Sequence, residues 1–172
     1  MGVPLTKKRA DKNFIGAAGE HLVLSRLYAR RVLASLAPPN TPEVDILVNP
    51  IDGNNSKLIQ VKSTESSGKD RGWSMRDEHL SLVSPKLFYC FVELSSNPQN
   101  VQNVYVIPSG VVAQVLKEAD KAYMNKPQRD GSARTKHSRR MLKPNFLVDI
   151  PSAPVGWMGT YLERWDLLKN DE

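Results

Sequence analysis

Two short apolar segments, 44–48 and 58–62, constrain the fold of this chain more than any other feature. The first reads Val-Asp-Ile-Leu-Val and the second Leu-Ile-Gln-Val-Lys. Runs of five residues rich in Val, Ile and Leu are typical of β-strands. Between them, Asp52–Asn55 reads Asp-Gly-Asn-Asn, which is a strong turn signal. The pattern therefore predicts an antiparallel hairpin.

Each of these predicted strands carries polar residues that an ordinary core strand would lack. Strand side chains alternate between two faces, so Gln60 and Lys62 share one face while Ile59 and Val61 point into a core. Asp45 interrupts the first strand in the same manner. A carboxylate, an amide oxygen and an ammonium on neighbouring strands are groups that phosphodiester hydrolysis would use.

The remaining apolar patterns predict a mixed α/β domain with a central mixed β-sheet flanked by helices. Helical spacing predicts a first helix over 11–31, capped by Asp11, and the pattern after it predicts a strand over 32–37. Further strands are predicted over 87–94 and 104–107, and a second helix from Pro108 to about Tyr123. The polar segment 63–72 is predicted to be a loop, segment 73–84 fits neither pattern clearly, and short elements are expected at 146–150 and 161–168.

The first predicted helix carries a carboxylate on its apolar stripe. Gly16, Val23, Leu24 and Leu27 lie at helical spacing, and Glu20 falls on the same stripe. A buried carboxylate is costly unless a partner compensates it. Glu20 is therefore a candidate site residue, although an ion pair or a surface position is the ordinary explanation for such a glutamate.

Length and charge predict one domain with an anionic partner. The chain has 172 residues, 40% of them apolar, which suits a single domain over 1–172 with a flexible N-terminus at 1–10. The net charge is +6, yet segment 121–143 alone holds eight Lys or Arg against one acid. We expect a basic loop over 124–145 to contact nucleic-acid phosphates, unless it is merely a solvated charge run. The candidate nucleic-acid-binding residues are Lys7, Lys8, Arg9, Arg134, Lys136, Arg139 and Arg140.

The cysteine, the histidines, the tryptophans and the apolar runs limit the kinds of site and compartment that the sequence predicts. Cys90 is the only cysteine and lies in an apolar run, so we expect a buried thiol in a reducing compartment. No signal segment and no run of about 20 apolar residues is present, so a cytoplasmic protein without membrane contact is expected. The three histidines lack the spacing of a zinc site, and the three tryptophans are expected in the core or at an interface, not as platforms for base stacking.

Three motifs resemble those of the PD-(D/E)XK nuclease superfamily, which has a restriction-endonuclease-like fold. They are Gly16–Glu20 (Gly-Ala-Ala-Gly-Glu), Pro42–Asp45 (Pro-Glu-Val-Asp) and Gln60–Lys62 (Gln-Val-Lys), and the resemblance spans about 11–107. The usual acid of the last motif is glutamine here. Mrr-like nucleases are similar in this respect, and the pattern also resembles Holliday junction resolvases. The resemblance implies a Mg²⁺-dependent endonuclease acting on DNA.

The resemblance also implies roles for individual residues. Mg²⁺ or Mn²⁺ would be held by Asp45, Gln60, Glu20 and the carbonyl of Val61. Lys62 would orient the attacking water or offset charge in the transition state, which makes Glu20, Asp45, Gln60 and Lys62 the catalytic set. Glu43 is a spare carboxylate outside the predicted strand and is the less favoured ligand.

Two other functions remain open at this point. An amide oxygen ligates a hard cation more weakly than a carboxylate, so Gln60 also fits a catalytically weak or silent nucleic-acid-binding module of the same fold. The third possibility is a scaffold subunit of a defence or repair assembly. Symmetric cleavage of a duplex would favour a homodimer.

Overall fold

The computed structural model describes most of the chain. The described residues are 7–49, 55–65, 72–95, 97, 99–128, 130–135 and 139–169, with the side chains of 7–11 and 139 left out. The helices and strands are α1 (Lys7–Ala29), β1 (Ala34–Leu36), β2 (Ile46–Val48), β3 (Lys57–Glu65), β4 (Trp73–Arg76), β5 (Leu87–Leu94), β6 (Asn103–Pro108), α2 (Ser109–Asn125) and β7 (Arg139–Leu142). Three short 3₁₀ helices are η1 (Asp77–Leu80), η2 (Trp157–Tyr161) and η3 (Trp165–Leu168).

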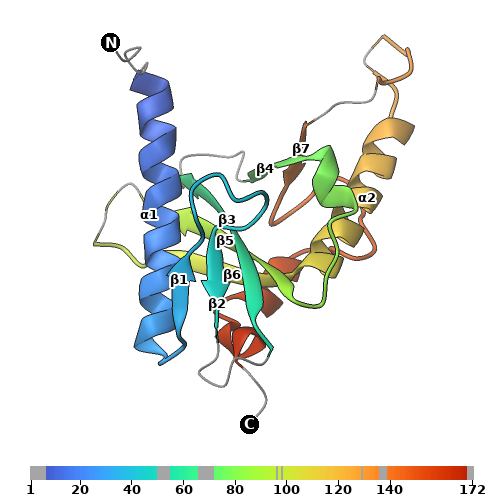
Figure 1. Ribbon diagram of the computed structural model, residues 1–172. Helices are drawn as coiled ribbons and strands as arrows, with labels where there is room; N and C mark the ends of the chain where they lie inside the picture. Colours follow the sequence, from blue (N-terminus) through green and yellow to red (C-terminus); the bar gives the residue numbers. More distant parts are fainter. Residues whose placement is uncertain are drawn as a thin grey trace.

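A five-stranded mixed sheet forms the centre of the molecule, in the order β1-β2-β3-β5-β6 (Figure 1). β3 pairs in parallel with β5, and the other neighbours are antiparallel. The predicted hairpin is confirmed, because Ile46 of β2 lies opposite Ile59 of β3. Its turn residues 52–54 fall outside the described part of the chain. The predicted mixed α/β fold with a central mixed sheet and flanking helices is therefore confirmed.

Each face of the sheet packs on its own helix. On one face, Ile59 and Val61 of β3 join a core with α1 and η3. On the other face, Tyr89 and Phe91 of β5 join a core with α2, η2 and the small β4–β7 sheet. Figure 1 shows α1 and α2 on opposite sides of the central strands. Cys90 of β5 is fully buried in the first core, as its sequence context predicts.

The structure corrects the predicted course of α1. The helix begins at Lys7, so residues 7–10 are not a flexible tail and Asp11 lies inside the helix instead of capping it. Its most buried positions are Gly19, Val23 and Leu27, spaced by four residues. The stripe therefore runs through Gly19, and Glu20 lies at its half-buried margin.

Several strand predictions also change. β2 begins one residue after Asp45, which lies just before the strand. β3 continues to Glu65 because its second half still pairs with β5, so 63–65 are not part of a loop. The predicted basic loop over 124–145 includes β7, which pairs with β4. Residues 146–150 form no regular element.

The tryptophans lie in the cores, as predicted, with Trp73, Trp157 and Trp165 all buried. Among the described residues, no helix is both long enough and apolar enough to cross a membrane.

Candidate functional site

β3 presents a polar face as its alternation predicts. Ile59 and Val61 face the α1 core, while Gln60 and Lys62 point to the opposite side. Gln60 is only 6% exposed, which is unusual for an amide and requires polar partners. The end of β3 that carries Gln60 and Lys62 therefore holds a buried polar site on the β4 side of the sheet.

Asp45 is fixed to β3 by two hydrogen bonds. Its backbone N–H donates to the Ile59 carbonyl at 2.9 Å, and its carboxylate Oδ2 accepts from the Val61 N–H at 2.7 Å. The Val61 bond favours the ionised carboxylate, as does nearby Lys62. Burial and the charge of Glu43 act in the other direction and prevail, so the pKa of Asp45 is raised. The Val61 hydrogen bond therefore fixes the position of the Asp45 carboxylate, and Lys62 offsets its negative charge only in part.

Glu20 reaches the same site from α1. Burial first, and then the charge of Asp45, raise the pKa of Glu20. Gly19 allows α1 to lie this close to β3, because a Cβ there would sit 1.8 Å from Ser63 Oγ and 2.9 Å from Ser63 Cβ. The carboxylates of Glu20 and Asp45, which come from α1 and from the loop before β2, are thus close enough to interact electrostatically.

Glu43 joins the site from the loop before β2. Its φ of 57° is left-handed, a conformation that costs free energy for a residue with a side chain and often marks functional sites. The turn brings its Oε2 to 2.8 Å from Gln60 Nε2, which donates a hydrogen bond. The other atom of that amide, Gln60 Oε1, is buried and has no hydrogen-bond partner among the residues that the structure describes.

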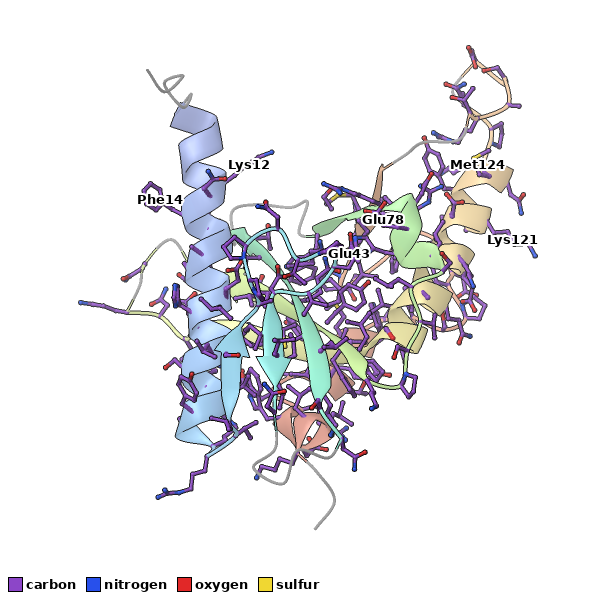
Figure 2. All side chains as sticks on the ribbon, viewed as in Figure 1. Lys12, Phe14, Glu43, Glu78, Lys121 and Met124 are labelled. Atoms are coloured by element: carbon purple, nitrogen blue, oxygen red, sulfur yellow. The ribbon has the colours of Figure 1, made fainter. Side chains whose placement is uncertain are left out.

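His79 and Glu78 of η1 complete the cluster. His79 is 1% exposed, and its Nδ1 lies 2.9 Å from Tyr89 Oη and 3.5 Å from Glu43 Oε2. Burial lowers the pKa of His79, and Lys62 lowers it further, so the imidazole is held neutral. One ligand atom from each of Glu43, Glu78 and His79 lies within 4.8 Å of the others. Figure 2 labels Glu43 and Glu78 next to each other at this end of the sheet.

Lys62 is the cation at the centre of these acids. Burial lowers its pKa, while Glu43 and then Asp45 raise it. Arg76 of β4 is a second cation, which pairs with Glu78 at 3.3 Å on the surface. The described residues of the site therefore bring four carboxylates together with two cationic side chains.

The donor set fits a hard divalent cation. Carboxylate and amide oxygens are the ligands that Mg²⁺ prefers, and mutual repulsion between acids is relieved by a bound cation. The buried Gln60 Oε1 is the observation that tests this fit, because a cation would supply the partner that the described residues do not. Glu20, Asp45 and Gln60 are the residues that would hold it.

The described arginines of the predicted basic loop are not fully exposed. Arg140 is 8% exposed and pairs with Asp77 and Asp120, so acids of neighbouring elements offset its charge. Arg134 is only half-buried; it donates to the Lys126 carbonyl and stacks over Tyr123. The side chains of the remaining candidates, Lys7, Lys8, Arg9, Lys136 and Arg139, lie outside the described set.

The sequence predicts Glu43 only as the less favoured ligand, and it does not predict Glu78 or His79 as members of the cluster. Glu43 was the less favoured ligand because it precedes the strand, and its left-handed turn has no periodic signature. Glu78 and His79 lie in a segment whose pattern fits neither helix nor strand. The adjacent acid and histidine between two strands were the only available signal.

Comparisons with known proteins assign this chain to no family. A scan against models of protein families finds no match, and neither does a search of curated proteins. Among solved structures, this chain is similar to a bacterial homing endonuclease, I-Ssp6803I. The TM-score is 0.49 and the sequence identity 15%, over 91% of this chain and 89% of that chain. A likeness at this level assigns no activity, so the function is argued from the site.

Proposed function

We propose that this chain is a metal-dependent nuclease that hydrolyses phosphodiester bonds of nucleic acid, with DNA as the expected substrate. The catalytic residues are Glu20, Asp45, Gln60 and Lys62, as in the Gln-x-Lys variant of the PD-(D/E)XK superfamily. The domain would span 1–172. No part of this proposal rests on the likeness to the solved structure.

One observation carries the proposal. The Val61 N–H of β3 fixes the Asp45 carboxylate at 2.7 Å beside the buried Gln60 amide, whose Oε1 has no partner among the described residues, and Glu20 of α1 lies close enough for burial and the charge of Asp45 to raise its pKa. A fold gains no stability from two such carboxylates, because burial and repulsion both oppose their ionised forms. Perturbed acids beside a lysine are typical of catalytic sites.

Each residue has a distinct part in the proposed reaction. A bound Mg²⁺ or Mn²⁺ would polarise the phosphoryl oxygen and lower the pKa of a water. Asp45 and Glu20 would supply the negative charge that holds the cation, and Gln60 Oε1 and the Val61 carbonyl would supply neutral oxygen atoms. Half-buried Lys62 would stabilise negative charge on the phosphoryl oxygens in the transition state.

The test is cleavage of plasmid and branched DNA in Mg²⁺ or Mn²⁺ by the purified chain and two variants. Asp45→Asn and Lys62→Met keep the size of each side chain and remove its charge. We expect each to reduce the rate by at least about 100-fold, the loss typical of removing one electrostatic group from a site. Chelation with EDTA should abolish cleavage.

Matched controls separate the site from general charge effects. Asp149→Asn and Lys86→Met change exposed residues outside the site and should leave the rate unchanged. Equal cleavage by the wild type and both site variants would reject the proposal. An absence of cleavage by every protein would reject it as well.

A second candidate is a nucleic-acid-binding module without catalysis. It is favoured by a pocket of about 430 Å³ between α2, β7 and segment 143–148, whose lining includes Lys126, Arg134 and Lys143. Retained DNA binding in the absence of cleavage would support this module. Its affinity should then fall with salt, because phosphate contacts release counterions.

A further inference from the structure

The side-chain amide of Gln60 has two ends with opposite chemistry, so its orientation decides what the residue can bind. The oxygen Oε1 can ligate a cation, whereas the Nε2 group only donates hydrogen bonds. Gln60 is 6% exposed, so neighbouring protein groups set this orientation in place of bulk water. The contact made by the amide nitrogen therefore determines whether the oxygen is available for a cation.

Glu43 is the neighbour that distinguishes the two ends of this amide. Its Oε2 accepts a hydrogen bond from Gln60 Nε2 at 2.8 Å. A carboxylate carries acceptors only, so turning the amide over would bring two oxygen atoms together and replace a charge-assisted hydrogen bond by repulsion. Glu43 therefore favours one orientation, in which Oε1 lies on the other side of the amide. That oxygen is buried and has no hydrogen-bond partner among the residues with described positions.

The loop before β2 holds Glu43 in the place that this contact needs. The φ of Glu43 is 57°, a left-handed value that persists in a residue with a side chain where the surrounding structure enforces it. Two residues later, the Asp45 N–H donates to the Ile59 carbonyl and Asp45 Oδ2 accepts from the Val61 N–H, so the loop is anchored to β3. The loop thus sets one acid on the Val61 backbone and a second acid on the Gln60 side chain.

We propose that Glu43 is a positioning residue, which orients the Gln60 amide so that Oε1 is available to the cation of the proposed nuclease site. Glu43 acts through Gln60 and does not itself contact the cation. The inference rests on the cation site of the proposed function, although it does not require cleavage of nucleic acid. It also accounts for the residue type at position 60. A glutamate there would face Glu43 with two acceptors, whereas glutamine has a donor on one side and a ligand on the other.

The test is the Mn²⁺ affinity of the full chain without nucleic acid, measured from the electron paramagnetic resonance signal of free Mn²⁺. Glu43→Met keeps an unbranched side chain but removes the acceptor, and it should weaken binding by about tenfold, as loss of a contact to a metal ligand does. Glu43→Gln keeps an acceptor oxygen without the charge, so it should bind at least about threefold more tightly than Glu43→Met. Gln60→Met removes the amide itself, and adding Glu43→Met to it should weaken binding by less than about threefold, because the two residues act as a unit.

A matched control and a second measurement separate positioning from other effects. Glu65→Met makes the same substitution at an exposed position of β3 and should bind Mn²⁺ as the wild type does. Carbon NMR of the glutamine side-chain carbonyls adds a readout that needs no variant. Mg²⁺ should shift the carbonyl signal of Gln60 and leave that of exposed Gln114 unchanged.

Four outcomes would overturn the positioning role of Glu43. They are equal losses of affinity in Glu43→Met and Glu43→Gln, the same loss from Glu43→Met with and without Gln60→Met, an unshifted Gln60 carbonyl, and a wild-type chain that binds no Mn²⁺. A chain that shows the expected binding pattern but does not cleave DNA would lose the proposed function and keep this inference.

Discussion

Two glutamates in the left-handed conformation, Glu43 and Glu163, lie in polar clusters with opposite character. Glu163 accepts hydrogen bonds from the guanidinium of Arg26 and from Trp165 Nε1, and it pairs with Arg30 at 3.4 Å. Arg30 also lies over the Trp165 ring. Glu43 instead accepts a hydrogen bond from the Gln60 amide, lies 3.5 Å from the His79 ring, and interacts electrostatically with both Asp45 and Lys62.

The two clusters differ in how far donors and cations compensate the charge of the glutamate. The Glu163 cluster matches its carboxylate with donors and cations, so it stabilises the packing of η3 against α1. In the Glu43 cluster, burial and the charge of Glu43 raise the pKa of Asp45, burial and the charge of Asp45 raise the pKa of Glu20, and a buried oxygen lacks a partner within the described residues. Partly compensated acids of this kind are the reason that we place the proposed site at the Glu43 cluster.

The largest expected effect concerns α1, which carries Glu20 to one cluster and Arg26 to the other. Gly19→Ala places a methyl group against Ser63 and should lower the free energy of unfolding by about 2 kcal/mol, as overpacking does. The measurement is urea unfolding followed by circular dichroism. Gly16→Ala is the matched control, since its Cβ would meet nothing within 4 Å, and it should be neutral or slightly stabilising. Equal effects at both positions would contradict the close approach of α1 to β3.

A smaller effect is expected when the free energies of unfolding of Glu163→Gln and Glu43→Gln are compared. Glu163→Gln leaves Arg26, whose side chain is 21% exposed, without its ionic partner and should cost about 1.5 kcal/mol. Glu43→Gln keeps the size and the left-handed backbone but should change stability by less than about 0.5 kcal/mol, because it also removes repulsion. The readout is the urea midpoint of each variant. If Glu43→Gln costs as much as Glu163→Gln, the Glu43 cluster is also structural.

The smallest expected effect is a rise in melting temperature when Asp45 is replaced by Asn, and the size of this rise depends on pH. The pKa of Asp45 is higher in the folded chain than in the unfolded one, so the folded state binds more protons and stability falls as the pH rises through that window. Asp45→Asn should therefore raise the melting temperature by about 2 °C at neutral pH in EDTA, and by less near pH 4. Asp166→Asn is the control of opposite sign, because Arg164 lowers the pKa of Asp166. A melting temperature lowered by Asp45→Asn would show that its hydrogen bond to Val61 outweighs its burial.

Local periodicity accounts for what the sequence predicted correctly. The period of two placed Gln60 and Lys62 on one face of β3, and apolar runs located β5 and α2 to within two residues. The partners of Gln60 were not predicted, because Glu43 reaches it through a left-handed turn and His79 from a 3₁₀ helix. The burial of Arg140 depends on the pairing of β7 with β4, which connects residues more than sixty positions apart.

The burial of Cys90 has a practical consequence for the candidate site. Its thiol lies on β5, the parallel neighbour of β3, opposite Val61, whose N–H holds Asp45. A thiol reagent can reach Cys90 only when the core between the sheet and α1 opens, and burial also raises the pKa of the thiol, which slows its reaction further. The rate of labelling of the only cysteine in the sequence therefore reports the opening of the core beneath the strand on which the site is built.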